Sequence, residues 1–334
     1  MTYAEAMVVG LIQGVTELFP VSSLGHNVLI PALIGGSWAQ DLNVSAPESP
    51  YLAFIVGLHV ATAAALIVYF WRDWVRLFGG FLSSLRERRI ATADQRLAWM
   101  IILATIPVGI AGLVLEHAFR VYFSKPVPTA IFLAVNGVIL LGGERAVRRR
   151  TSALAAPAPE PARAGGPQAE HAGGLTPEPA EPAEPAEPAE PARDREVARG
   201  IAADGRLSLM SFGRALLIGS AQIFALLPGI SRDGVVTVTG MLRGSSREDA
   251  VRFSFLLSTP VILAAGVLKV PDLTGTLGNG IRGQVLAGSL LSFVGAYLSV
   301  RFLTRYFAKD RPLTPFGIYC LLAGLGSLVY LLVR

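Results

Sequence analysis

The sequence has little charge and almost no cysteine. Charged side chains make up 16% of the 334 residues, whereas soluble domains carry about 25%. A water-soluble class is therefore disfavoured. The single cysteine, Cys320, excludes a disulfide framework and a cysteine-based zinc site. No lysine or arginine precedes Arg72, and the apolar start contains Glu5, Gln13 and Glu17, so we do not expect a secretory signal peptide.

Long apolar runs occupy most of the chain. A helix that rises ~1.5 Å per residue needs roughly 20 apolar residues to cross ~30 Å of hydrocarbon. Six segments approach this length with almost no charge, and we expect six transmembrane helices there. They are 52–71, 97–116, 127–143, 253–268, 284–300 and 313–333.

The distribution of lysine and arginine predicts an orientation. The connections 72–96, 144–214 and 301–312 are rich in these residues, and the connections 117–126 and 269–283 are poor. Basic loops stay in the cytoplasm, so the rich connections are expected there and the C-terminus outside. This rule also accounts for the net charge of +5, and we expect no nucleic-acid partner.

Two further apolar segments are interrupted by turn residues. Residues 3–35 are broken at Pro20, and residues 211–247 are broken at Pro228 and Gly229. Each segment has to return to the side from which it enters if the six spans are to keep their orientation. Irregular backbone at membrane depth is tolerated where protein buries it or a wet cavity surrounds it. The sequence therefore predicts two re-entrant hairpins.

The hairpins resemble each other. Gly10 to Gly25 in the first and Gly219 to Gly234 in the second span the same length, with a proline between. Each hairpin precedes three spans, and an odd number inverts the second copy. Inverted repeats place sites where broken helices meet. The expected fold is an all-α integral membrane protein with six transmembrane helices and two re-entrant hairpins in an inverted repeat. Its parts are a first repeat, 1–147, a disordered Pro/Ala/Glu-rich cytoplasmic linker, 148–208, and a second repeat, 209–334.

The first hairpin carries polar groups on both sides of its break. Gln13 and Glu17 are four residues apart and share one face of a helix. Ser22, Ser23 and His26 follow the break. A carboxylate at membrane depth is costly and marks function. The alternative is that Glu17 is an isolated residue at the membrane interface.

The second hairpin combines a guanidinium with a glycine-flanked turn. Arg232 is always charged, and its planar fork suits phosphate. Backbone N–H groups between Gly229 and Gly234, leading into a helix, form an anion site. The alternative, compatible with the first, is that Arg232 pairs with Asp233 or Glu17 and closes the hairpin.

These residues resemble the signatures of the bacterial undecaprenyl-diphosphatase family, the bacitracin-resistance phosphatases. The motifs are Q-G-V-T-E…P-V-S-S-x-G-H at 13–26, P-G-I-S-R-x-G at 228–234 and S-R-E-D-A-V-R-F-S-F-L-L-S-T-P at 246–260. They occur in the family's order, and the likeness covers nearly the whole chain outside 151–205. The resemblance implies an inverted-repeat fold with two re-entrant helix pairs.

The resemblance also implies residue roles. By matching position, these are Gln13 and Glu17 for a divalent metal, Mg²⁺ or Ca²⁺; Ser23 as nucleophile; His26 as general acid or base; Arg232 in catalysis; and Ser22, Gly229, Ser231, Arg232 and Gly234 for the diphosphate. Three residues depart from the family pattern. Leu24 replaces a small hydroxyl residue, Asn27 replaces an apolar residue, and Asp233 replaces a serine. The Asp233 carboxylate either neutralises Arg232, repels the diphosphate or serves as an extra metal ligand.

The function implied is hydrolysis of undecaprenyl diphosphate to undecaprenyl phosphate and phosphate, which recycles the lipid carrier for cell-wall synthesis and confers bacitracin resistance. The implied place is the bacterial cell membrane, among membrane lipids, with the site open to the extracytoplasmic side; a homodimer is left open. A polyprenyl-phosphate flippase is the alternative, because the same inverted repeat suits transport. A two-histidine lipid phosphatase is excluded because no histidine follows His171. His59, in an apolar span, is expected to be a helix-packing residue.

Overall fold

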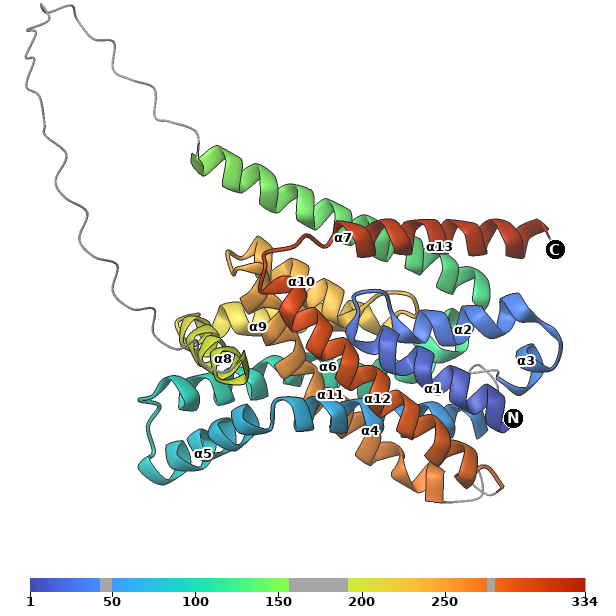
Figure 1. Ribbon diagram of the computed structural model, residues 1–334, viewed down its shortest axis with the longest axis horizontal. Helices are drawn as coiled ribbons and strands as arrows, with labels where there is room; N and C mark the ends of the chain where they lie inside the picture. Colours follow the sequence, from blue (N-terminus) through green and yellow to red (C-terminus); the bar gives the residue numbers. More distant parts are fainter. Residues whose placement is uncertain (43–49, 156–191, 275–279, 334) are drawn as a thin grey trace, which may run out of the picture.

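The computed structural model describes residues 1–42, 50–155, 192–274 and 280–333 (Figure 1). Every regular element in these ranges is a helix. The elements are α1 (Tyr3–Leu18), α2 (Ser23–Ile34), α3 (Gly36–Asp41), α4 (Pro50–Tyr69), α5 (Trp71–Glu87), α6 (Ala93–Phe123), α7 (Pro126–Ala155), α8 (Ala192–Ser208), α9 (Phe212–Ser220), the 3-10 helix η1 (Ala221–Leu226), α10 (Arg232–Leu242), α11 (Arg247–Thr274), α12 (Arg282–Phe307) and α13 (Thr314–Val333).

Several of these helices have the length and composition of membrane spans. Within the described ranges, five qualify on their own: α6, α7, α11, α12 and α13. Two bent pairs, α4 with α5 and α8 with α9 and η1, raise the number to seven if each pair is one span. The fold is therefore the all-helical, multi-pass membrane type that the apolar runs predict.

Both expected hairpins contain a helix, a break and a second helix. α1 begins at a capping box between Thr2 and Glu5 and ends before Phe19, because Pro20 cannot continue it. In the second hairpin, α9 continues into η1, and Gly229 takes a positive φ of 110° in the break. The residue after each break is a serine whose side chain caps the next helix, Ser22 for α2 and Ser231 for α10.

Glycines allow each hairpin to approach a long helix closely. α1 packs along α12, and a Cβ at Gly10 would collide with the carbonyl oxygen of Gly288. α9 packs against α6, and a Cβ at Gly219 would collide with the carbonyl oxygen of Ala104. α7 lies along α13, and α4 lies against α11. The first helices of the two hairpins, α1 and α9, are thus both packed through a glycine against the backbone of a long helix.

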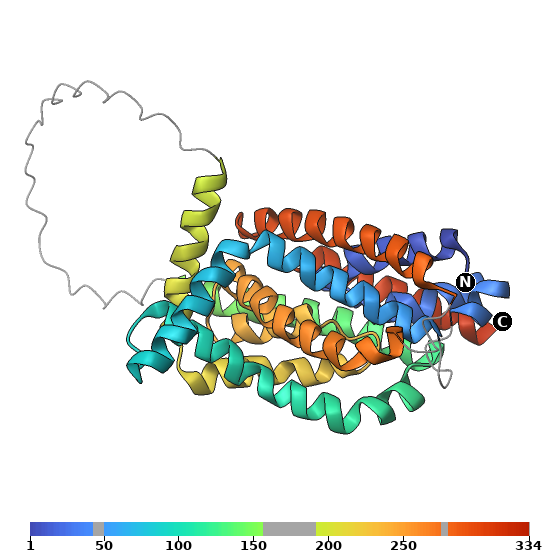
Figure 2. The same cartoon turned by 90° about the horizontal axis from the view of Figure 1, so that it is seen from below.

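Helices also form where the sequence led us to expect loops. α5 lies within the predicted 72–96 loop, and residues 192–208, which we assigned to a disordered linker, form α8; that part of the linker prediction is wrong. Buried ion pairs explain α8, because Asp204 pairs with both Arg76 and Arg252 and is itself 1% exposed. The rest of the expected linker, 156–191, lies outside the described residues. α5 and α8 lie at the end of the molecule opposite to the two termini (Figures 1 and 2).

Candidate active site

The breaks of the two hairpins touch. The Ser22 hydroxyl accepts hydrogen bonds from the backbone N–H of Gly25, which caps α2, and from that of Gly229 in the other hairpin, both at 3.2 Å. Ser22 itself has a φ of 68°, which is unusual for a residue with a side chain and costs about 1–3 kcal/mol. The contact between the hairpins therefore rests on a strained residue of the first break.

Asn136 on α7 ties the breaks together from a third helix. Its Nδ2 donates to the carbonyl oxygen of Pro20 at 3.0 Å, and its Oδ1 accepts from the N–H of Ser231 at 3.0 Å. The side chain is completely buried. Sequence reasoning missed this residue. Its only signal was an amide inside an apolar span, where an amide needs partners.

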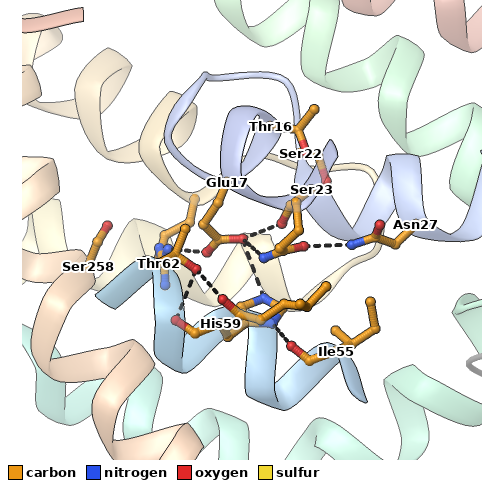
Figure 3. A network of polar contacts seen from close by, with 12 residues as sticks. Thr16, Glu17, Ser22, Ser23, Asn27, Ile55, His59, Thr62 and Ser258 are labelled. Atoms are coloured by element: carbon orange, nitrogen blue, oxygen red, sulfur yellow. Dashed lines mark hydrogen bonds and ion pairs between the residues drawn. The ribbon is translucent and has the colours of Figure 1, made fainter. Parts of the chain in front are cut away.

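Glu17 lies at the centre of a polar cluster (Figure 3). One carboxylate oxygen accepts from Nη2 of Arg232 at 2.6 Å. The other accepts from Nε2 of Gln13 at 2.8 Å and from the Ser23 hydroxyl. The predicted convergence of the two hairpins on one site is confirmed, because Glu17 and Arg232 are in direct contact. The expected closing ion pair of Arg232 is the one with Glu17.

His59 belongs to this cluster, contrary to our expectation of a packing residue. Its Nε2 lies 3.4 Å from the Glu17 carboxylate, while its Nδ1 bonds to the carbonyl oxygen of Ile55 at 2.8 Å. The bond to Ile55 fixes the ring on α4 and directs Nε2 toward Glu17 (Figure 3). The sequence places His59 in an apolar helix, but it does not indicate which residue of another helix the imidazole contacts.

Arg232 retains donors for another anion. Its side chain is 15% exposed and makes an ion pair with Glu17. Its Nε is buried and has no hydrogen-bond partner in the described structure. A buried guanidinium with an unsatisfied N–H favours an additional acceptor. Arg232 is also the first residue of α10, a helix start whose Gly234 N–H is capped by the Ser231 hydroxyl, and helix starts favour anions.

His26 is held by different groups from those around Glu17. Its Nδ1 bonds to the carbonyl oxygen of Ser22, and its Nε2 bonds to the hydroxyl of Tyr319 on α13, both at 2.7 Å. The two rings are stacked, with centroids 5.7 Å apart. The imidazole therefore lies on the helix of Ser23, one turn beyond it, and is oriented by α13. Tyr319 is a second residue that the sequence did not single out.

The departures Asn27 and Asp233 both have partners. Asn27 Nδ2 donates to Oε1 of Gln13 at 2.6 Å, which orients the amide that bonds to Glu17. Asp233 accepts from the hydroxyls of Ser254 and Ser258 on α11 at 2.6 and 2.7 Å. Both of these hydrogen bonds are to α11 and neither involves Arg232. Its second oxygen is buried without a partner among the described residues.

The cluster offers a divalent cation one carboxylate, that of Glu17, so most other ligands of such a cation would have to come from substrate or water. No group of three His, Cys, Asp or Glu side chains occurs in the described ranges, so these residues hold no preformed cage. Mg²⁺ is commonly bound by one or two carboxylates together with substrate phosphates and waters. Glu17 supplies a carboxylate of this kind, whereas the amide of Gln13 turns its Nε2 toward Glu17 and its oxygen toward Asn27.

Together, these groups form a buried site for phosphate chemistry. A hydroxyl, Ser23, donates to a carboxylate that is also paired with a guanidinium. The hydroxyl is thus placed beside a proton acceptor and beside an anion-binding group, which are the two requirements for transferring a phosphoryl group. Glu17 and Ser23 are each 8% exposed, so the charges act in an environment with little water.

Comparison with known proteins agrees with this geometry. The family described as "Bacitracin resistance protein BacA" matches residues 6–165 and 192–326. A protein named undecaprenyl-diphosphatase from Mycolicibacterium paratuberculosis is 59% identical over 334 residues, covering 100% of this chain and 99% of the relative. Undecaprenyl-diphosphatase 1 of Frankia casuarinae is 52% identical, covering 97% and 96%, and undecaprenyl-diphosphatase 2 of Chromobacterium violaceum is 39% identical, covering both chains completely.

Proposed function

Because the chain belongs to the bacitracin resistance protein BacA family, we propose that the cluster around Glu17 is its phosphatase site. The protein is an undecaprenyl-diphosphate phosphatase. It hydrolyses undecaprenyl diphosphate to undecaprenyl phosphate and inorganic phosphate, and bacitracin resistance fits this activity. The observation that carries the site assignment is the contact of Glu17 with both Ser23 and Arg232.

Arg232 and the start of α10 bind the diphosphate. The guanidinium has an unsatisfied N–H, and N–H groups at a helix start attract anions. When the substrate binds, the guanidinium of Arg232 donates hydrogen bonds to both Glu17 and a phosphate oxygen. Ser22, Gly229, Ser231 and Gly234 shape this turn, since the two serines cap the helices that meet there.

Ser23 attacks the terminal phosphorus. Its hydroxyl donates to Glu17, so the carboxylate receives the proton as the new Ser–O–P bond forms. The P–O bond to the bridging oxygen breaks, and undecaprenyl phosphate leaves with that bond's electron pair. Water then hydrolyses the phosphoserine and regenerates the hydroxyl. His26 moves the proton for one of these steps, on the same helix as Ser23.

A divalent cation, Mg²⁺ or Ca²⁺, is the proposed cofactor. Gln13 and Glu17 would hold it, with Asp233 as a further candidate ligand. When bound, such a cation neutralises charge on the diphosphate. The direct contact of Glu17 with Arg232 supports this proposal, because it places a carboxylate beside the guanidinium that would bind the diphosphate.

The finer topology is also a proposal: six transmembrane helices and two re-entrant hairpins in an inverted repeat. It is supported by packing that matches between the two repeats: α1 packs on α12, and α9 packs on α6 in the same way. Corresponding helices of the two repeats also pack on each other, as the pairs α7–α13 and α4–α11. The same arrangement places the first hairpin, with both its ends, at the end of the molecule that carries the termini (Figure 2). Because the opposite end carries the basic connections, the site opens to the extracytoplasmic side of the cell membrane.

A phosphate-release assay tests the function. Purified protein with undecaprenyl diphosphate and Mg²⁺ or Ca²⁺ should release phosphate, and Ser23→Ala should abolish release and the phosphoserine trapped by rapid acid quench. Turnover that survives Ser23→Ala would assign the attack to water. The inverted repeat also suits a flippase. Lipid movement across vesicles by Ser23→Ala would add transport to the activity, and no phosphate release by the wild type would reject the phosphatase.

A further inference from the structure

A cavity of about 770 Å³ lies away from the Glu17 cluster, among the ends of α4 and α12, the starts of α5 and α11, and the middle of α8. Four arginines that line it have no ion-pair partner in the described part of the chain: Arg72, Arg199, Arg301 and Arg305. Arg252, a fifth, is held by Asp73 and Asp204. Three carboxylates line the cavity, Asp73, Glu196 and Glu248, against five arginines, so positive charge exceeds negative.

The bend between α4 and α5 fixes the depth of this cavity in the membrane. The two helices are inclined by 85°, so α5 lies nearly flat when α4 crosses the bilayer. Five exposed apolar residues recur on α5 at spacings of three and four, as in helices that lie in a membrane interface. They are Trp71, Val75, Phe78, Leu82 and Leu85. Trp71 and Arg72 at the bend line the cavity, which is therefore level with lipid headgroups.

An apolar track leads from the cavity toward the hydrocarbon. Leu298 and Phe302, 59% and 51% exposed, precede Arg301 and Arg305 by three residues each on α12 and face outward. They line a second cavity of about 340 Å³ that shares both arginines and adds Lys309. Apolar side chains beside basic ones match a molecule with an anionic head and an acyl chain.

We propose that the larger cavity binds the phosphate headgroup of an anionic phospholipid of the cytoplasmic leaflet. The lysine and arginine distribution assigns this end of the molecule to the cytoplasm. Anionic lipids are attracted there by basic residues near the surface, and basic pockets between helices bind their headgroups. Guanidinium groups also bind phosphate through paired N–H donors. The lipid bridges α4, α8 and α12, three elements that are far apart in the sequence.

Lipid titration of the full chain tests this site. Purified protein in mild detergent is titrated with phosphatidylglycerol and, separately, with phosphatidylcholine of the same acyl chains, and bound lipid is counted by native mass spectrometry. We expect preferential phosphatidylglycerol binding by the wild type. Because each basic residue contributes about fivefold in affinity, the double variant Arg301→Gln/Arg305→Gln should bind it about 30-fold more weakly. Arg301→Lys/Arg305→Lys should stay within about fivefold of the wild type.

The matched control removes the same charge outside the cavity. Arg86→Gln/Arg149→Gln changes two exposed arginines on the same side of the protein, neither of which lines the cavity, and should bind as the wild type does. Equal binding of both lipids, or an equal loss in the control, would overturn the proposal. So would displacement by millimolar inorganic phosphate alone, or tighter binding of a polyprenyl phosphate. If the first double variant does not fold, Arg72→Gln/Arg199→Gln provides the same test.

Discussion

Gly10 in the first hairpin and Gly219 in the second have the same task, since each brings its helix against the backbone of a long neighbour. The serines at corresponding places, Ser22 and Ser231, both cap the helix after the break. The two hairpins therefore share a scaffold of close approach, break and capped helix.

The chemistry that the hairpins carry is different. Where the first has Glu17, the second has Leu226, and where the first has Ser23, the second has Arg232. Gln13 bonds to Glu17 and Asn27, whereas its counterpart Gln222 bonds to the Gly219 carbonyl and leaves its oxygen without a partner among the described residues. The first hairpin supplies the proton acceptor, Glu17, and the hydroxyl, Ser23, and the second supplies the guanidinium of Arg232. Neither is a site alone.

The largest expected effect comes from removing the contribution of the second hairpin. Arg232→Ala should lower kcat/KM for undecaprenyl diphosphate by about 10³-fold or more, since a positioned arginine stabilises the charge of phosphoryl transfer. The kcat/KM of Arg232→Lys should lie between those of the wild type and Arg232→Ala, because an ammonium group cannot form the paired hydrogen bonds of a guanidinium. Arg243→Ala, exposed at the end of the same helix, is the control, and an equal loss there would contradict the assignment.

Removing the contribution of the first hairpin should cost somewhat less. Glu17→Gln keeps the shape but not the charge, and phosphate release should fall by about 10²–10³-fold, as for loss of a general base. Glu5→Gln at the other end of α1 should be near wild type. If adding Leu226→Glu restored phosphate release to the Glu17→Gln variant, the two hairpins would be interchangeable, which would contradict the difference described above.

The bridge between the hairpins should affect stability as well as rate. Asn136→Leu leaves the Ser231 N–H without a partner and the Pro20 carbonyl with only the Cys320 thiol at 3.7 Å. An unsatisfied buried group costs about 1–3 kcal/mol. We expect a lower thermal midpoint in detergent and about tenfold slower phosphate release. Thr129→Val, on the same helix, removes one long bond of 3.4 Å. If both variants behave alike, the bridge has no special role.

Asp233→Ser should have the smallest effect. The carboxylate is bonded to Ser254 and Ser258 on α11, so its replacement leaves the contact of Arg232 with Glu17 in place. Phosphate release should stay within about threefold of the wild type, measured at saturating metal. A loss of metal dependence in this variant would instead identify Asp233 as a ligand.

The sequence was informative about the hairpins because breaks and polar residues are local. Pro20, Gly229 and the polar residues around them predicted both breaks. The requirement that charge be paired in a membrane left Asp233 or Glu17 as the partner of Arg232, and the structure has Glu17. α8 was missed because its stability comes from Asp204 with Arg76 and Arg252. Arg76 and Arg252 are distant from Asp204 in the sequence, and the polar composition of residues 192–208 by itself predicts a linker.

Apolar length, proline and intramembrane charge act locally, so the order of residues alone was enough to predict the all-helical membrane fold and the two broken segments. The contacts of His59 with Glu17, of Asn136 with both breaks and of His26 with Tyr319 became known only from the packing of the helices. Each of these depends on the rotation of one helix against another. That rotation is set by packing, such as the glycine contacts of α1 with α12, which no single segment encodes.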